Sequence, residues 1–171
     1  MSPVSSASMR LGETGQGNAA PNARALSSKE ESLPMPPPLK TYIVEDSQVI
    51  RENLIATLEE LAPVEVVGTA EDEFTAVQWL MRPGNRFDLV IVDIFLKGGS
   101  GLGVLRSTNA LPQRHKMVVL SNYTTPDMRR KCLELGADKV FDKSTEIEAL
   151  ILYCDRLATG ATGNSGPGAL S

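Results

Sequence analysis

Five polar residues lie at the ends of four short apolar segments, and their types are those that phosphoryl-transfer chemistry uses. Glu45 and Asp46 follow TYIV, Asp93 ends FDLVIVD, Ser121 ends KMVVLS and Lys143 ends KVFDK. If these segments are parallel strands of one sheet, their carboxyl ends border one crevice, where open α/β sheets bind their ligands. The sequence therefore predicts a site with three carboxylates, a hydroxyl and an ammonium group.

The predicted site has the groups needed to accept a phosphoryl group. Carboxylates that lie close together raise one another's pKa values. A hard divalent cation relieves the repulsion between the carboxylates. Mg²⁺ is usually held by a few carboxylates together with waters and phosphate oxygens. Asp93 could attack phosphorus as a carboxylate nucleophile. Lys143 would bind one phosphoryl oxygen and Ser121 would donate a hydrogen bond to another, which is most of what phosphoryl transfer needs.

Each of these residues alone has an ordinary structural explanation. Asp46 could cap the following helix, Ser121 could be a turn residue, and Lys143 could be a solvated surface side chain. Their joint occurrence at four strand ends is hard to attribute to capping. A glycine-rich segment, KGGSGLG (97–103), lacks the spacing of a dinucleotide-binding loop, so we predict that it forms a tight loop beside Asp93.

Five apolar runs alternate with helical patterns between about residues 39 and 158. The runs are TYIVE (41–45), VEVVGTA (64–70), DLVIVD (88–93), KMVVLS (116–121) and KVFD (139–142). The third and fourth runs contain almost continuous apolar residues, as expected of strands that are covered on both faces of a parallel sheet. The alternation predicts right-handed crossovers and an α/β, doubly wound sheet.

Several residues have the types that begin helices. Asp72 is expected to cap the second helical segment, and Thr125 and Pro126 are expected to begin the fourth. Thr145 and Glu148 match a capping box, which predicts the start of the fifth helix.

Length, charge and cysteine content exclude several classes of protein. The 171 residues indicate one domain, and the net charge of −4 gives no basic face for nucleic acid. The single His115 cannot build a histidine-based metal site, and Cys132 and Cys154 suggest no disulfide framework. The apolar runs are too short to span a bilayer, and we find no secretory signal. We therefore expect a cytoplasmic protein that binds neither membrane nor nucleic acid.

Both ends of the chain have the composition of disordered tails. Residues 1–38 hold six of the eleven prolines, and residues 159–171 are poor in core-forming side chains. We predict two disordered tails around a domain at 39–158. Inert flanks are the simpler interpretation, although the proline run could bind a partner.

Taken together, the ordered motifs resemble the receiver domain of two-component response regulators over about residues 39–158. The motifs that carry the resemblance are Glu45-Asp46, LVIVD ending in Asp93, Gly101 eight positions later, VVLS with Ser121, LGAD (135–138) and Lys143. This resemblance implies a (βα)5 flavodoxin-like fold, with a parallel five-stranded sheet of strand order 2-1-3-4-5.

The resemblance also implies a role for each site residue. Asp93 would be the phosphoacceptor, and Ser121 and Lys143 would bind the phosphoryl oxygens. The implied Mg²⁺ ligands are Asp46, Asp93, the backbone carbonyl of Phe95 and, through water, Glu45. The phosphoryl donor would be a phosphohistidine on a sensor histidine kinase or a histidine phosphotransfer protein.

Some positions depart from the pattern of the family. Ser144 follows the lysine where proline is usual, and Val140 stands where a switch aromatic is common. Phe141 is adjacent, but strand alternation predicts that it points to the opposite face. Phe95 and Tyr123 lie where the family tunes access of water, so we hypothesise a long phosphorylated lifetime.

The function that the resemblance implies is that of a single-domain response regulator, which is not an enzyme. Phosphorylation would change a protein-binding surface on the fourth helix, fifth strand and fifth helix, which could also form a homodimer. Two alternatives keep the same fold: a phosphorylation-independent binding module and a phosphate shuttle in a phosphorelay. An aspartate-nucleophile phosphatase is disfavoured, because such enzymes usually have a second acid where this chain has Phe95.

Overall fold

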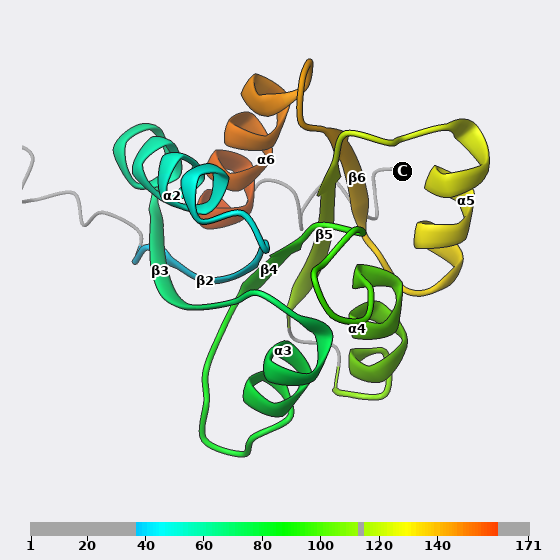
Figure 1. Ribbon diagram of the computed structural model, residues 1–171. Coiled ribbons are helices and arrows are strands. Elements are labelled where there is room, and N and C mark those ends of the chain that lie inside the picture. The colour runs from blue at the N-terminus through cyan, green and yellow to red at the C-terminus, as the bar shows by residue number, and fades with distance from the viewer. Residues whose placement is uncertain (1–36, 113–114, 161–171) are drawn as a thin grey trace, which may run out of the picture. The chain divides into compact units, whose positions relative to one another are not determined.

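A computed structural model describes residues 37–112 and 115–160 (Figure 1). The predictions of disordered tails therefore fall mostly on residues outside the described ranges. The elements in chain order are β2 (Leu39–Val44), α2 (Gln48–Leu61), β3 (Val64–Ala70), α3 (Glu73–Leu80), β4 (Leu89–Val92), α4 (Gly101–Thr108), β5 (Lys116–Ser121), α5 (Pro126–Glu134), β6 (Lys139–Asp142) and α6 (Ile147–Thr159). No helix in the described ranges is long and apolar enough to cross a membrane.

The five strands form one parallel sheet in the order β3-β2-β4-β5-β6. Numbered along the sheet by chain order, this is 2-1-3-4-5, so the predicted doubly wound fold is confirmed. Helices α2 and α6 cover one face of the sheet, and α3, α4 and α5 cover the other (Figure 1). Every pair of neighbouring strands is parallel, so the carboxyl ends of the strands share one edge.

The position of β4 at the centre of the sheet explains why its sequence is apolar without alternation. All four of its residues are buried, and they divide between the two layers. Val90 and Val92 pack with the side of α3, α4 and α5, while Leu89 and Ile91 pack with α2 and α6. Each such burial contributes roughly 1.5–3 kcal/mol, so β4 anchors the residue that follows it, Asp93.

Side-chain caps fix where most of the helices begin. Asp72 accepts a hydrogen bond from Thr75 N, and Thr125 accepts one from Met128 N, as the sequence predicts. The start of α2 is capped by Ser47. The carboxylate of Asp46 is therefore not needed as the cap of that helix.

The predicted capping box at the start of α6 is wrong. The N-cap residue is Glu146, and its side chain makes no capping hydrogen bond. Instead, Glu146 Oε1 accepts hydrogen bonds from Asp142 N at 2.7 Å and from Arg129 at 2.9 Å. The helix thus starts one residue later than predicted, and the carboxylate of Glu146 bonds to Arg129 and to the Asp142 amide instead of capping the helix.

Candidate functional site

The carboxyl edge of the sheet brings three of the predicted site residues into direct contact. Lys143 Nζ lies 2.6 Å from Glu45 Oε1 and 2.7 Å from Asp93 Oδ2. These residues follow β6, β2 and β4, which are separated in the chain but terminate at one edge. The ammonium group therefore bridges two carboxylates that would otherwise repel each other.

Burial makes this charge cluster electrostatically strong. The side chains of Glu45, Asp93 and Lys143 are only 3%, 10% and 11% exposed. Burial raises the pKa of Glu45, although hydrogen bonds from Lys143 and Ser47 N oppose the increase. Burial alone would lower the pKa of Lys143, but hydrogen bonds and charges of Asp93 and Glu45 together raise it. The lysine is therefore held in its charged form between the acids.

Asp93 is positioned by its own backbone and by the loop that follows. Its amide donates to Val44 O at 3.0 Å, and its Oδ1 accepts from Phe95 N at 3.3 Å. Gly101 N donates to Ile94 O at 2.8 Å, which folds the glycine-rich loop back beside Asp93 as predicted. A Cβ on Gly101 would collide with the carbonyl oxygen of Asp93, so the close approach requires glycine there.

Ser121 lies at the end of β5 and is fully buried. Its backbone carbonyl accepts a hydrogen bond from Lys143 N at 2.9 Å, and its Oγ accepts one from Tyr123 N at 3.3 Å. No hydrogen bond joins its hydroxyl to Glu45, Asp93 or Lys143 among the described residues. The structure thus places Ser121 at the same edge but outside the charge cluster.

The donor atoms near Asp93 suit Mg²⁺ better than a softer metal. Asp46 is partly exposed, and its carboxylate forms no hydrogen bond with another described residue. No group of three His, Cys, Asp or Glu side chains that could hold a metal occurs in the part of the chain that the structure describes. Two carboxylates, a backbone carbonyl and waters form an oxygen set of the kind that Mg²⁺ prefers. By their chemistry these groups suit Mg²⁺, and Asp46, Asp93, the Phe95 carbonyl and, through water, Glu45 stay its predicted ligands.

A family model of the response regulator receiver domain matches residues 41–155. The chain belongs to the response regulator receiver family. Receiver domains in this family generally accept a phosphoryl group on an aspartate and bind Mg²⁺ at an acidic pocket. They are phosphoacceptor signalling domains and are generally not catalytic.

Among curated proteins, the chain is similar to larger proteins that contain more than this domain. It is 30% identical to protein-glutamate methylesterase/protein-glutamine glutaminase 5 of Anaeromyxobacter dehalogenans, over 77% of this chain and 37% of that protein. It is 24% identical to response regulator UvrY of Escherichia coli K12, over 66% of this chain and 51% of that protein. The chain thus spans about half or less of the length of these relatives.

Solved structures support the fold of the receiver domain. The signal receiver domain of the putative response regulator NarL from Mycobacterium tuberculosis matches with a TM-score of 0.63 and 20% identity, over 73% of this chain and 99% of that one. A Burkholderia pseudomallei response regulator, solved with a phosphorylated aspartic acid and a calcium ion, matches with a TM-score of 0.59 and 21% identity, over 77% of this chain and 74% of that one. At these identities the likeness shows the fold alone.

The structure gives a physical reason for one departure from the receiver pattern. Ser144, in place of proline, uses both its backbone amide and its hydroxyl to donate to Asp142 Oδ1. Thr124 Oγ1 donates to the other oxygen of Asp142 at 2.9 Å. These bonds, led by the one from the Ser144 hydroxyl, lower the pKa of Asp142 to about 2. Proline at 144 would lack the amide donor.

A second departure concerns the position of the switch aromatic. Val140 packs in the layer of α3, α4 and α5, whereas Phe141 packs on the opposite face against Tyr153, with ring centroids 5.9 Å apart. The predicted opposite orientation is confirmed. The receiver domain therefore has no aromatic side chain at 140 to follow movements of the loop after β5.

Arg129 of α5 links the loop after β5, strand β6 and the start of α6. Its guanidinium donates to Val140 O at 2.9 Å, to Glu146 Oε1 at 2.9 Å and to Thr124 O at 3.3 Å. We call this set, with Asp142, the Arg129 network. The sequence does not predict this network, because an arginine in the basic run Arg129-Arg130-Lys131 gives no sign of its partners.

Two aromatic side chains stand beside the acidic site. Phe95 and Tyr123 are 52% and 64% exposed, and their rings meet edge to face with centroids 5.0 Å apart. Phe95 follows Asp93 by two positions, and Tyr123 follows Ser121 by two. The hypothesis that this pair lengthens the phosphorylated lifetime stays a prediction.

Proposed function

We propose that this receiver domain is a phosphorylation switch in which Asp93 is the phosphoacceptor. The observation that carries the proposal is the position of Lys143, whose ammonium contacts both Asp93 and Glu45 at 2.6–2.7 Å. A buried lysine at this point provides a positive charge within reach of any phosphoryl group on Asp93. The proposed donor is a phosphohistidine of a sensor kinase or phosphotransfer protein, and the proposed compartment is the cytoplasm.

The proposed reaction forms one bond and breaks one. A carboxylate oxygen of Asp93 attacks phosphorus, the P–N bond of the phosphohistidine breaks, and the departing imidazole keeps the bonding electrons and takes up a proton. Lys143 then turns from the carboxylates to a phosphoryl oxygen, and Ser121 donates a hydrogen bond to another. Mg²⁺, when held by Asp46, Asp93 and the Phe95 carbonyl, supplies further positive charge against the phosphoryl oxygens.

We propose that the output is a change in the surface formed by α5, β6 and α6. If Ser121 moves toward the phosphoryl group, the loop after β5 moves with it, including Thr124. Thr124 is bonded to Asp142 and to Arg129, so this movement would break or rearrange the Arg129 network. The network is thus the proposed two-state element, and the partner is a downstream protein or a second copy of the chain.

The test is the intact mass of the protein after incubation with Mg²⁺ and acetyl phosphate. We expect one added phosphoryl group in the wild type, and none in Asp93→Asn or without Mg²⁺. The matched control is Asp88→Asn, which changes an aspartate at the opposite end of β4 and should leave phosphoryl uptake intact. Because some receivers ignore small donors, an absence of uptake would be followed by incubation with phosphorylated histidine kinases.

Continued absence of uptake would favour the phosphorylation-independent binding module. Transfer kinetics distinguish the shuttle from the terminal switch. A shuttle would pass its phosphoryl group rapidly to a phosphotransfer histidine, whereas a terminal switch would release it as inorganic phosphate.

A further inference from the structure

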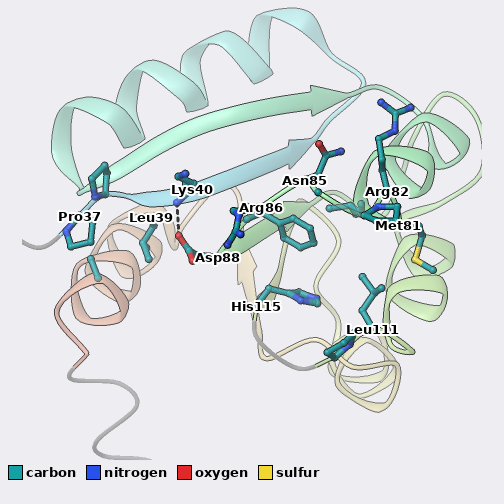
Figure 2. Close-up of a pocket in the computed structure, with 17 residues that line it drawn as sticks. Pro37, Leu39, Lys40, Met81, Arg82, Asn85, Arg86, Asp88, Leu111 and His115 are labelled. Atoms are coloured by element: carbon teal, nitrogen blue, oxygen red, sulfur yellow. Dashed lines mark hydrogen bonds between the residues drawn. The ribbon is translucent and has the colours of Figure 1, made fainter.

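A second concave site lies at the amino ends of the strands, opposite the acidic edge. It has a volume of about 870 Å³ and is bordered by the starts of β2 and β5 and by the segment between α3 and β4 (Figure 2). Pockets of roughly 300–1,000 Å³ are typical of small-molecule sites. The proposed phosphorylation reaction uses none of the residues that line it.

His115 lines this pocket and has a buried ring nitrogen without a partner among the described residues. The residue is 6% exposed, and its Nε2 makes no hydrogen bond within the described part of the chain. One side of the ring packs against Phe87, with centroids 5.0 Å apart. Figure 2 shows the imidazole extending toward Leu111. Since buried polar atoms are nearly always hydrogen-bonded, an Nε2 without a partner among the described residues is suited to a hydrogen bond with a bound ligand.

The charge state of His115 fits a hydrogen-bonding role. Burial lowers the pKa of this imidazole, although the charge of Asp138 opposes the effect. The neutral ring has one nitrogen that donates and one that accepts, so it pairs readily with a hydroxyl group. A hydroxyl is both donor and acceptor, and it satisfies Nε2 in either tautomer.

The remaining lining combines cationic and apolar side chains. Lys40, Arg82 and Arg86 bring three positive charges to the pocket, against one carboxylate, Asp88. That carboxylate already accepts a hydrogen bond from the backbone amide of Lys40 at 2.8 Å (Figure 2). The apolar part of the lining includes Leu80, Met81, Phe87 and Leu111. Such a lining favours an apolar body with a negative charge over a bare inorganic anion.

We propose that this pocket binds a small amphipathic anion with an apolar ring system, a carboxylate and a hydroxyl group. The carboxylate would meet Arg86 and Lys40, and the hydroxyl would pair with His115 Nε2. The apolar body would lie on the side chains between them. This site is separate from Asp93, so the proposal stands whether or not the chain accepts a phosphoryl group.

The test is an NMR titration of the full chain with 6-hydroxy-2-naphthoate as the probe. We expect saturable binding, with amide shifts at Arg86, Leu111 and His115 and none at Asp93. Two analogues separate the polar contacts: 2-naphthoate lacks the hydroxyl, and 6-hydroxy-2-naphthamide lacks the charge. Each should bind at least roughly fivefold more weakly, an effect of about 1 kcal/mol.

Two variants connect these preferences to the residues. Arg86→Gln should remove the advantage of the carboxylate over the amide, while Arg106→Gln, an exposed arginine of α4, should not. His115→Phe keeps an aromatic ring against Phe87 and should remove the advantage of the hydroxyl. Absence of saturable binding would overturn the proposal. A carboxylate preference that persists in Arg86→Gln, a hydroxyl preference that persists in His115→Phe, or shifts that centre on Asp93 would also overturn it.

Discussion

The two ends of the sheet treat buried polar groups in opposite ways. At the carboxyl end, Lys143 is bonded to both Glu45 and Asp93, so the charges satisfy one another. At the amino end, the Nε2 of His115 is buried without a partner among the described residues. The charges of the first site pair with one another within the chain, whereas the second site leaves a nitrogen that we propose a ligand completes. Mutations at the two ends should therefore change stability with opposite signs.

The largest effect is expected for Lys143→Met. Removing the ammonium leaves Glu45 and Asp93 buried and facing each other, and breaking a buried pair typically costs about 3–5 kcal/mol. We expect a loss near the lower value, measured as the free energy of unfolding in urea at pH 7. The matched control is Lys116→Met, because Lys116 lies 4.0 Å from Asp138 with both side chains more than a third exposed. It should cost about 1 kcal/mol or less.

A second substitution and an alkaline titration check the cause. Adding Glu45→Gln to Lys143→Met should restore part of the stability, because only one carboxylate then remains ionised in the cluster. The folded-state pKa of Lys143 is raised above its ordinary value of 10.5. Its contribution is therefore present below that pH and lost as the pH rises through the folded pKa. Equal losses for Lys143→Met and Lys116→Met would contradict the comparison.

The opposite sign is expected for His115→Phe. The substitution removes an unpaired buried nitrogen, whose burial costs about 1–3 kcal/mol, and keeps an aromatic ring beside Phe87. We expect the free energy of unfolding to stay equal or to rise by about 1 kcal/mol. The gain is smaller than the full cost of the buried nitrogen, because the phenyl ring differs in shape from the imidazole and packs less well. His115→Ala should instead lose stability, because it leaves a cavity. If the Phe variant were clearly less stable than wild type, His115 would have a partner within the protein.

Sequence reasoning succeeded at the carboxyl end for a simple reason. Apolar runs without alternation predict strands that are covered on both faces of a parallel sheet, and a parallel sheet brings its strand ends together whatever the loops do. Asp93 and Lys143 could therefore be placed near each other from their positions alone. That Lys143 bonds directly to Glu45 could not be predicted, because it depends on side-chain conformation at the two strand ends.

The amino end could not be predicted in the same way. From the sequence, His115 is a single histidine that cannot build a metal site, and no pattern around it predicts its burial beside Phe87. The pocket depends on how the segment between α3 and β4 passes the start of β5, which no periodicity reports. The wrong capping box has a similar cause, because Arg129 engages Glu146 from another helix.

A smaller effect concerns the exposed aromatic pair at the carboxyl end. Phe95 and Tyr123 should limit the approach of water to phosphorylated Asp93, so Tyr123→Ala is expected to shorten the phosphorylated lifetime severalfold. The measurement is phosphate release after acetyl phosphate is removed. Phe74→Ala, on α3, is the control because Phe74 is 71% exposed and should have no effect. Rapid release by the wild type would contradict the hypothesis.

The smallest expected effect is on the pH dependence of stability, to which two carboxyl groups of the acidic edge, Glu45 and Asp142, contribute with opposite signs. Burial raises the pKa of Glu45, so keeping it ionised in the folded state costs stability as the pH rises above the ordinary carboxyl range. Asp142 has the opposite sign, since hydrogen bonds led by that of Ser144 lower its folded-state pKa from 3.8 to about 2. Its contribution is present above about pH 4 and is lost as the pH falls toward 2.

Asp142→Asn should therefore make the loss of stability between pH 4 and pH 2 less steep, as measured by urea unfolding across that window. Asp127→Asn is the matched control, because Asp127 is 85% exposed and pairs only with Arg130 among the described residues. Its profile should parallel that of the wild type. If Asp142→Asn also paralleled the wild type, the bonds from Ser144 and Thr124 would not favour the ionised carboxylate. Asp142 would then not anchor the Arg129 network, and another residue would have to link Thr124 to the loop after β6.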